Sequence, residues 1–147
     1  MKFITLSFCL IALLLFGSCS KNNKQAKTLD GTWSLKTWSW SGMGAVAAGS
    51  FTGTLGSWNF TACKASKDNC PASVNNFAGS ATNEAIQWYI REKGTRFTMA
   101  PDVSSSPLGN LGGEWEITEL SDNKFALSSE TCGSCKTNGK TILEFSR

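Results

Sequence analysis

The chain has 147 residues, of which 14 are basic and 11 acidic, and its formal net charge is +3 at neutral pH. This nearly even balance gives no electrostatic basis for nucleic-acid binding. The sequence contains no histidine, which excludes a serine–histidine–aspartate triad and a cysteine–histidine pair within the chain.

Residues 1–18 have the pattern of an export signal. A lysine near the start is followed by an apolar run over residues 3–16 and by the small residues Gly-Ser before Cys19. The run is shorter than the roughly 20 apolar residues of a membrane-spanning helix. The segment ending at Cys19 resembles the bacterial lipobox, which implies cleavage before this cysteine and attachment of lipid, palmitate included. An ordinary signal peptide with an incidental cysteine is the alternative.

Residues 19–28 are expected to form a lipidated, flexible tether. Beyond Cys19 this segment contains no apolar side chain larger than Ala26, so it has little surface with which to hold a fixed structure. A single folded domain is then expected over residues 29–147, which is a usual size for one domain.

The first expected strand, residues 32–40, carries three of the six tryptophans. Alternate residues of a regular strand point to opposite faces, so Trp33 would lie on one face and Trp38 and Trp40 on the other. A bulge near Lys36 would shift the register and bring both inside. Otherwise the two rings lie outside, under the following loop or in solvent. We expect the bulge or the loop cover, because two bare tryptophans are unfavourable unless a partner uses them.

Four cysteines belong to the expected domain: Cys63, Cys70, Cys132 and Cys135. In an exported protein they most simply form two disulfides, and we favour the local pairs, the first two together and the last two together. Two alternatives stay open. A zinc site would have the usual C-x2-C spacing in only one half. A redox-active Cys-Gly-Ser-Cys needs a helix N-terminus, whereas this segment lies between two expected strands.

The rest of the domain has the alternation of apolar and polar residues that half-buried antiparallel strands show. Turn residues such as Lys93-Gly94 and Asn138-Gly139 separate the runs. The expected strands are 32–40, 51–56, 57–63, 74–80, 85–93, 95–100, 114–120, 124–130 and 140–146. We therefore expect an all-β fold, an antiparallel up-and-down barrel of about eight strands, with a β-sandwich as the alternative.

Several short motifs resemble those of lipocalins. Residues 30–33, Asp-Gly-Thr-Trp, carry a Gly-x-Trp signature at the start of the first strand, and residues 113–127 and 141–145 are similar to the closing strands of lipocalin-like domains in bacterial envelope lipoproteins. The resemblance implies a small barrel with an apolar interior, closed at one end by Trp33. Arg147 is the best candidate for the arginine that usually covers this tryptophan.

The expected function is non-catalytic binding of a small hydrophobic ligand by a lipoprotein of the Gram-negative cell envelope, anchored at the outer membrane, without a cofactor or metal. The candidate cavity residues are Trp58, Phe60, Trp88, Ile90, Phe97, Met99, Trp115 and Phe125. Alternatively, these residues fill the core, and Trp38 and Trp40 on the surface bind a glycan or a partner protein. Catalysis is not expected, because the carboxylates of Glu114, Glu116 and Glu144 alternate outward.

Overall fold

The computed structural model describes residues 21–41, 48–63, 69–81, 83–101, 107–130 and 139–147. The predicted export signal, the predicted lipid attachment site at Cys19 and the predicted disulfide pair Cys132 and Cys135 lie outside these residues. Within them, no helix has the length and hydrophobicity needed to cross a lipid bilayer.

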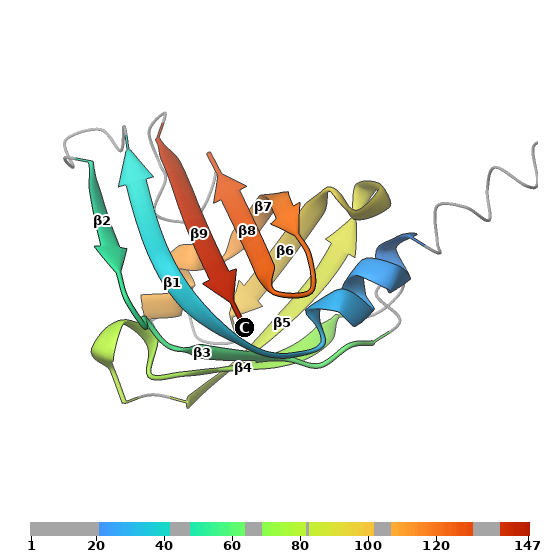
Figure 1. Ribbon diagram of the computed structural model, residues 1–147, viewed down its shortest axis with the longest axis horizontal. Helices are drawn as coiled ribbons and strands as arrows, with labels where there is room; N and C mark the ends of the chain where they lie inside the picture. The colour runs from blue at the N-terminus through green and yellow to red at the C-terminus, as the bar shows by residue number, and fades with distance from the viewer. Residues whose placement is uncertain (1–20, 42–47, 64–68, 82, 102–106, 131–138) are drawn as a thin grey trace, which may run out of the picture.

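Antiparallel strands form one sheet that closes into a barrel (Figure 1). The strands are β1 (Gly31–Ser41), β2 (Gly49–Thr52), β3 (Ser57–Phe60), β4 (Cys70–Asn75), β5 (Asn83–Arg91), β6 (Arg96–Pro101), β7 (Gly113–Leu120), β8 (Lys124–Ser129) and β9 (Lys140–Ser146). Each strand from β3 to β9 pairs with the next, and β1 pairs with both β3 and β9. Eight strands therefore close the barrel, and β2 is an extra strand along the second half of β1. The predicted all-β barrel is confirmed, and the β-sandwich alternative is wrong.

The barrel wall follows directly from the alternation of apolar and polar residues. In β5, Ile86, Trp88 and Ile90 are buried, whereas Gln87 and Arg91 are exposed. The connection from β5 to β6 is the short 3-10 helix η2 (Glu92–Gly94), in which the φ angles of all three residues are positive. A tight turn of this kind requires backbone conformations that glycine adopts most readily, which fits the predicted hairpin at this point.

A helix takes the place of the predicted flexible tether. Residues 21–29 are helical and lie against the end of the barrel at which β1 begins and β9 ends, which we call the helix end (Figure 1). Ala26 and Leu29 are fully buried, and Gln25 packs so closely on Gly94 that a Cβ at that glycine would overlap it. The sequence lacked the apolar periodicity of an amphipathic helix. The helix is held instead by individual contacts with distant residues, which composition does not predict.

Strand β4 begins earlier than predicted, at Cys70, and ends at Asn75. The predicted disulfide between Cys63 and Cys70 closes the connection from β3 to β4, with 5.4 Å between the two Cα atoms. The next residue, Asn76, is left-handed, and a 3-10 helix η1 (Phe77–Gly79) follows it. The prediction of a strand over 74–80 is therefore wrong. The strand begins with the disulfide-bonded Cys70 and with Pro71, which do not give the alternation of apolar and polar residues by which strands were predicted.

Candidate functional site

A bulge in β1 turns the second and third tryptophans of that strand into the barrel. Against β9, Leu35 pairs with Phe145 and Thr37 pairs with Glu144, so Lys36 is the extra residue. Beyond the bulge, Trp38 is opposite Leu143, whose side chain is fully buried. Directly opposite residues in an antiparallel pair point to the same face. Trp38 therefore faces inward, Trp40 two residues later shares this face, and the bulge considered from the sequence is present.

The two inward tryptophans belong to a cluster of four rings at the end of the barrel opposite the helix. We call it the far-end cluster, and its members are Trp38, Trp40, Phe51 and Phe77. The ring centroids of Trp38 lie 5.7 Å from Trp40, 5.8 Å from Phe51 and 5.5 Å from Phe77, and Trp40 lies 5.3 Å from Phe51. Phe51 is 50% exposed, whereas Phe77 is 1% exposed. The cluster thus runs without a break from solvent to the core.

Local backbone geometry holds the rings of this cluster in place. Phe77 lies between Asn76 and Ala78, both with positive φ, and the N–H of Ala78 donates to the carbonyl of Leu55 at 3.0 Å. Trp40 packs closely on β2, since a Cβ on Gly49 would come within 2.5 Å of its ring. Glycine at that position is what lets the indole approach the neighbouring strand so closely.

The eight candidate cavity residues all lie in the barrel interior, and each is at most 1% exposed. Their aromatic rings contact one another: Phe60 lies 5.6 Å from Trp88, Trp88 is stacked on Phe97 at 5.7 Å, and Phe97 lies 5.7 Å from Phe125. These rings form a packed aromatic core. Trp58 is the member of the eight that also contacts the far-end cluster, through Phe77 at 6.2 Å.

Four of the tryptophans are fully buried, and three of them donate their indole N–H to a backbone carbonyl. Trp33 donates to Leu29 at 2.8 Å, Trp88 to Pro71 at 3.2 Å and Trp115 to Leu111 at 2.9 Å. The Nε1–H of Trp58 is equally buried, but it has no acceptor among the residues that the structure describes. Buried donors are nearly always paired, so Trp58 is an exception among the buried side chains that the structure describes.

Trp33 and Arg147 meet at the helix end. The guanidinium carbon of Arg147 lies 4.3 Å from the centroid of the Trp33 ring. The same guanidinium donates to the carbonyl of Thr28 at 2.9 Å, to that of Asp30, and to that of Asp122 at 3.3 Å. Arg147 at the chain end therefore connects the helix, β1 and the β7–β8 turn around the ring of Trp33. The fold is that of an eight-stranded, up-and-down antiparallel barrel.

Comparison with known proteins gives structural neighbours only. No protein-family model matches the chain, and no curated protein matches it in sequence. A lipocalin-like protein from Bacteroides uniformis has 17% identity, covers 79% of this chain and 96% of its own, and superposes with a TM-score of 0.46. An uncharacterized protein from Bacteroides eggerthii also has 17% identity, with coverages of 79% and 98% and a TM-score of 0.40. The fold assignment rests on the strand order and helix-end contacts of this chain itself.

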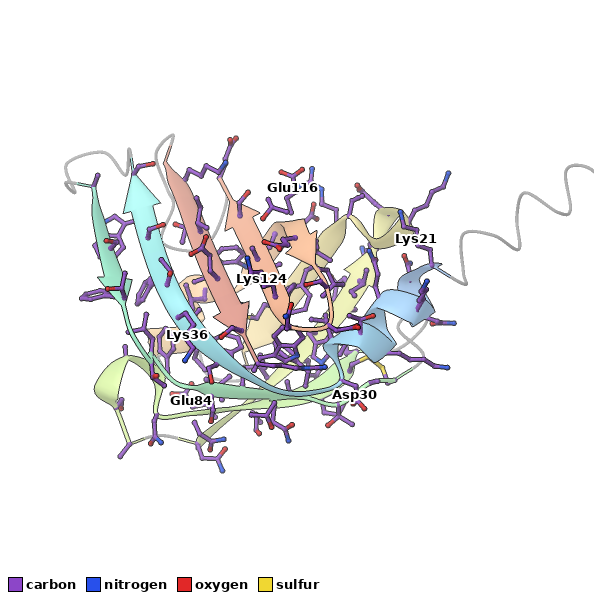
Figure 2. The ribbon with its side chains drawn as sticks, viewed as in Figure 1. Lys21, Asp30, Lys36, Glu84, Glu116 and Lys124 are labelled. Atoms are coloured by element: carbon purple, nitrogen blue, oxygen red, sulfur yellow. A yellow bond between two sulfur atoms is a disulfide. The ribbon has the colours of Figure 1, made fainter. Side chains whose placement is uncertain are left out.

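Charged side chains of the described residues lie on the outside of the barrel. Those labelled in Figure 2, Lys21 and Glu116 among them, are exposed or half-buried and belong to the helix and the outer wall. Arg96 is 3.5 Å from both Glu92 and Glu114 on this outer surface. In the described ranges, no three histidine, cysteine, aspartate or glutamate side chains gather in a way that would hold a metal ion.

Two members of the far-end cluster, Phe51 and Phe77, were not among the residues singled out from the sequence. Phe51 pairs directly with Trp38 across β1 and β2, a contact that depends on the register of the bulge. Phe77 was placed within a strand, and its position in η1 depends on the left-handed residues on either side. The density of aromatic residues between 33 and 77 was the signal available, but it does not say which rings share a face.

Proposed function

We propose that this protein binds a small apolar ligand at the far-end cluster, as a lipid-anchored, non-catalytic protein of the bacterial cell envelope. The observation that carries the proposal is the inward turn of Trp38 and Trp40 at the Lys36 bulge. Because of it, aromatic surface that reaches solvent at Phe51 is continuous with the interior through Phe77. Ligand sites in barrels are commonly concave, apolar and lined by such rings.

The rings of the cluster suit a ligand that contains a flat ring of its own. Their centroids are 5.3 to 5.8 Å apart and their planes are tilted by 31 to 57°. Aromatic pairs favour offset and tilted arrangements in this range of distances, and each contributes about 0.5–1.5 kcal/mol beyond the burial of its area. A ligand ring placed among Trp40, Phe51 and Trp38 would gain several contacts of this kind.

A surface module for a glycan or a partner protein is the competing function. It would need large aromatic side chains facing outward. Among the described residues, Phe51 is the one large apolar side chain that is exposed, and Trp38 and Trp40 face the interior instead. The small-ligand function is therefore the better supported of the two.

The proposed lipid anchor would leave the cluster accessible to water. Cys19 precedes the described helix by two residues, which span at most about 7 Å. This helix packs at the helix end of the barrel. Its Gln25 side chain contacts Gly94, and its Leu29 carbonyl accepts the indole N–H of Trp33. The far-end cluster lies at the other end of the barrel, so lipid on Cys19 would hold the binding end away from the membrane.

The proposal is tested with N-phenyl-1-naphthylamine, a neutral apolar probe whose fluorescence rises in apolar sites. We expect saturable one-to-one binding by the purified protein, with a Kd in the micromolar range. Trp40→Ala and Phe51→Ala each remove a ring of the cluster and should weaken this binding by at least about 10-fold. This change corresponds to a loss of about 1.4 kcal/mol of binding free energy. The measurement is a fluorescence titration at constant protein concentration.

Tyr89→Ala is the matched control. It removes an aromatic ring that lies under Arg91, at 4.4 Å, on the outer side of β5, and it should leave the Kd unchanged within about 2-fold, a free-energy difference of roughly 0.4 kcal/mol. Absence of saturable binding, or an equal loss with Tyr89→Ala and Trp40→Ala, would overturn the proposed function.

A further inference from the structure

Among the described residues, one buried side-chain donor has no hydrogen-bond acceptor. Trp58 is fully buried, and its Nε1–H has no partner in the described part of the chain. A buried donor left in this state costs about 1–3 kcal/mol. The other three fully buried tryptophans each donate to a backbone carbonyl, so the fold satisfies such groups where the backbone comes within reach.

Trp58 lies one layer of rings below the far-end cluster. It faces the interior on β3, opposite Trp33 of β1 and Val74 of β4, both fully buried. Its ring meets Phe145 edge-on at 5.2 Å and Phe77 edge-on at 6.2 Å. Phe77 in turn contacts Trp38 at 5.5 Å. The ring of Phe77 therefore connects Trp38 of the far-end cluster to the indole of Trp58.

The surroundings of Trp58 determine which kind of acceptor fits. No charged side chain is buried in the described part of the chain, where the buried polar side chains are Ser128, Ser129 and Thr141. The hydroxyl of Ser129 donates to the carbonyl of Glu114 at 2.8 Å. A carboxylate or phosphate brought to Trp58 would be a buried charge without a counter-charge, which is strongly unfavourable. A neutral oxygen carries a far smaller desolvation penalty.

We propose that the indole Nε1–H of Trp58 donates a hydrogen bond to a neutral oxygen acceptor of the ligand, such as a ketone, ester or ether. This inference rests on the proposed function and narrows its ligand class to uncharged, ring-containing molecules with an oxygen near one end. The far-end cluster holds the apolar body of the ligand, and Trp58 selects the acceptor. Apolar analogues without that oxygen leave the donor unpaired, and anionic analogues bring an uncompensated charge.

Two naphthalene probes that differ in one acceptor test the inference. The first is 6-propionyl-2-dimethylaminonaphthalene, and the second is 2-dimethylaminonaphthalene, which lacks the propionyl group. We expect the full-length protein to prefer the first by about 10-fold beyond the difference in their partition into alkane, because an unpaired buried donor costs about 1–3 kcal/mol. In Trp58→Phe, which keeps a ring and removes the donor, this preference should vanish while the second probe binds as before.

Trp88→Phe is the matched control, because it removes a buried indole whose N–H is already paired with Pro71. This variant should keep the 10-fold preference. A measurement on the unsubstituted protein gives a second reading that needs no altered core. The indole proton of Trp58 should shift downfield in a ¹H–¹⁵N spectrum when the propionyl probe binds and stay in place with the other probe.

The outcomes separate this inference from the proposed function. Equal preference in Trp58→Phe and the original protein, with no shift of the Trp58 indole proton, overturns the inference but leaves the proposed function standing if both probes bind. An indole proton already shifted downfield before any probe is added, and unmoved by it, would show that a buried water satisfies Trp58, and it also overturns the inference. If neither probe binds, the proposed function fails, and the inference fails with it.

Discussion

At the residue scale, Arg147 is the side chain on which the helix end depends. Its guanidinium lies over Trp33 and donates to carbonyls of Thr28, Asp30 and Asp122. Hydrogen bonds from charged groups contribute about 1.5–3 kcal/mol when well formed, and a cation–π contact adds about 0.5–1 kcal/mol at an exposed site. We expect Arg147→Ala to lower the free energy of unfolding by about 2 kcal/mol, because solvent around this exposed residue reduces these values. Urea unfolding followed by tryptophan fluorescence measures the change.

Arg91→Ala provides the comparison for Arg147. Arg91 also lies over an aromatic ring, that of Tyr89 at 4.4 Å. This pair is on the outer wall, and the Arg91 guanidinium donates to no carbonyl of the described residues. Its removal should change stability by at most about 0.5 kcal/mol, the usual range for surface substitutions. Equal losses in the two variants would show that Arg147 acts as an ordinary surface cation.

At the element scale, the bulge in β1 decides which way the far-end tryptophans point. Consecutive residues of a regular strand point to opposite faces, so deletion of Lys36 together with Thr37 places Trp38 directly after the inward Leu35, opposite the outward Glu144, and should turn Trp38 and Trp40 outward. We expect the deletion to weaken probe binding by more than about 10-fold, a loss of at least about 1.4 kcal/mol, and to shift tryptophan emission to longer wavelength. Probe titration and emission spectra of the folded variant measure these effects.

Lys36→Ala separates the bulge from the side chain that occupies it. The backbone of Lys36 accepts a hydrogen bond from the N–H of Gly53 at 3.0 Å, and alanine keeps this carbonyl. Binding and emission should therefore match those of the original protein. If the deletion variant still binds the probe with unshifted emission, the register of β1 is not what brings the two rings inside.

The same element shows how far the sequence alone leads. Alternation of residue types predicted the barrel and located strands such as β7 and β8 to within a residue or two. It also showed that Trp33 and the pair Trp38 and Trp40 cannot share a face without a bulge. It could not choose between a bulge and outward-facing rings, because that choice depends on the pairing of β1 with β9, the last strand of the chain.

The parts that sequence reasoning missed depend on contacts between distant residues. The helix over 21–29 gains its place from the burial of Leu29 and from Gln25 packed on Gly94, and neither contact leaves a periodic pattern. The cavity prediction used the same eight residues that pack as an aromatic core. Their spacing shows that they face inward, but whether inward rings leave space or fill it depends on the packing of all the strands together.

At the scale of the whole molecule, the barrel has two ends with different properties. The helix end carries the N-terminal helix, the disulfide between Cys63 and Cys70, and the Trp33–Arg147 contact. The far end carries the aromatic cluster with exposed Phe51. β1 runs between the two ends with 11 residues, which at about 3.3 Å per residue extends over roughly 36 Å. A lipid anchor at one end and a binding site at the other would then be separated by most of this length.

Together with the proposed lipid anchor, this polarity predicts the orientation of the protein on a membrane. Two exposed residues mark the ends, Thr61 just after β3 at the helix end and Ser50 on β2 at the far end. Thr61→azidophenylalanine and Ser50→azidophenylalanine, each coupled to the same fluorescent donor, are compared in vesicles that contain an acceptor-labelled lipid. Energy transfer should be strong from position 61 and weak from position 50, since the second donor stands roughly 30 Å farther from the lipid surface, as the strand rise implies. Equal transfer from the two positions would mean that the barrel lies on its side, and stronger transfer from position 50 would place the aromatic cluster against the bilayer.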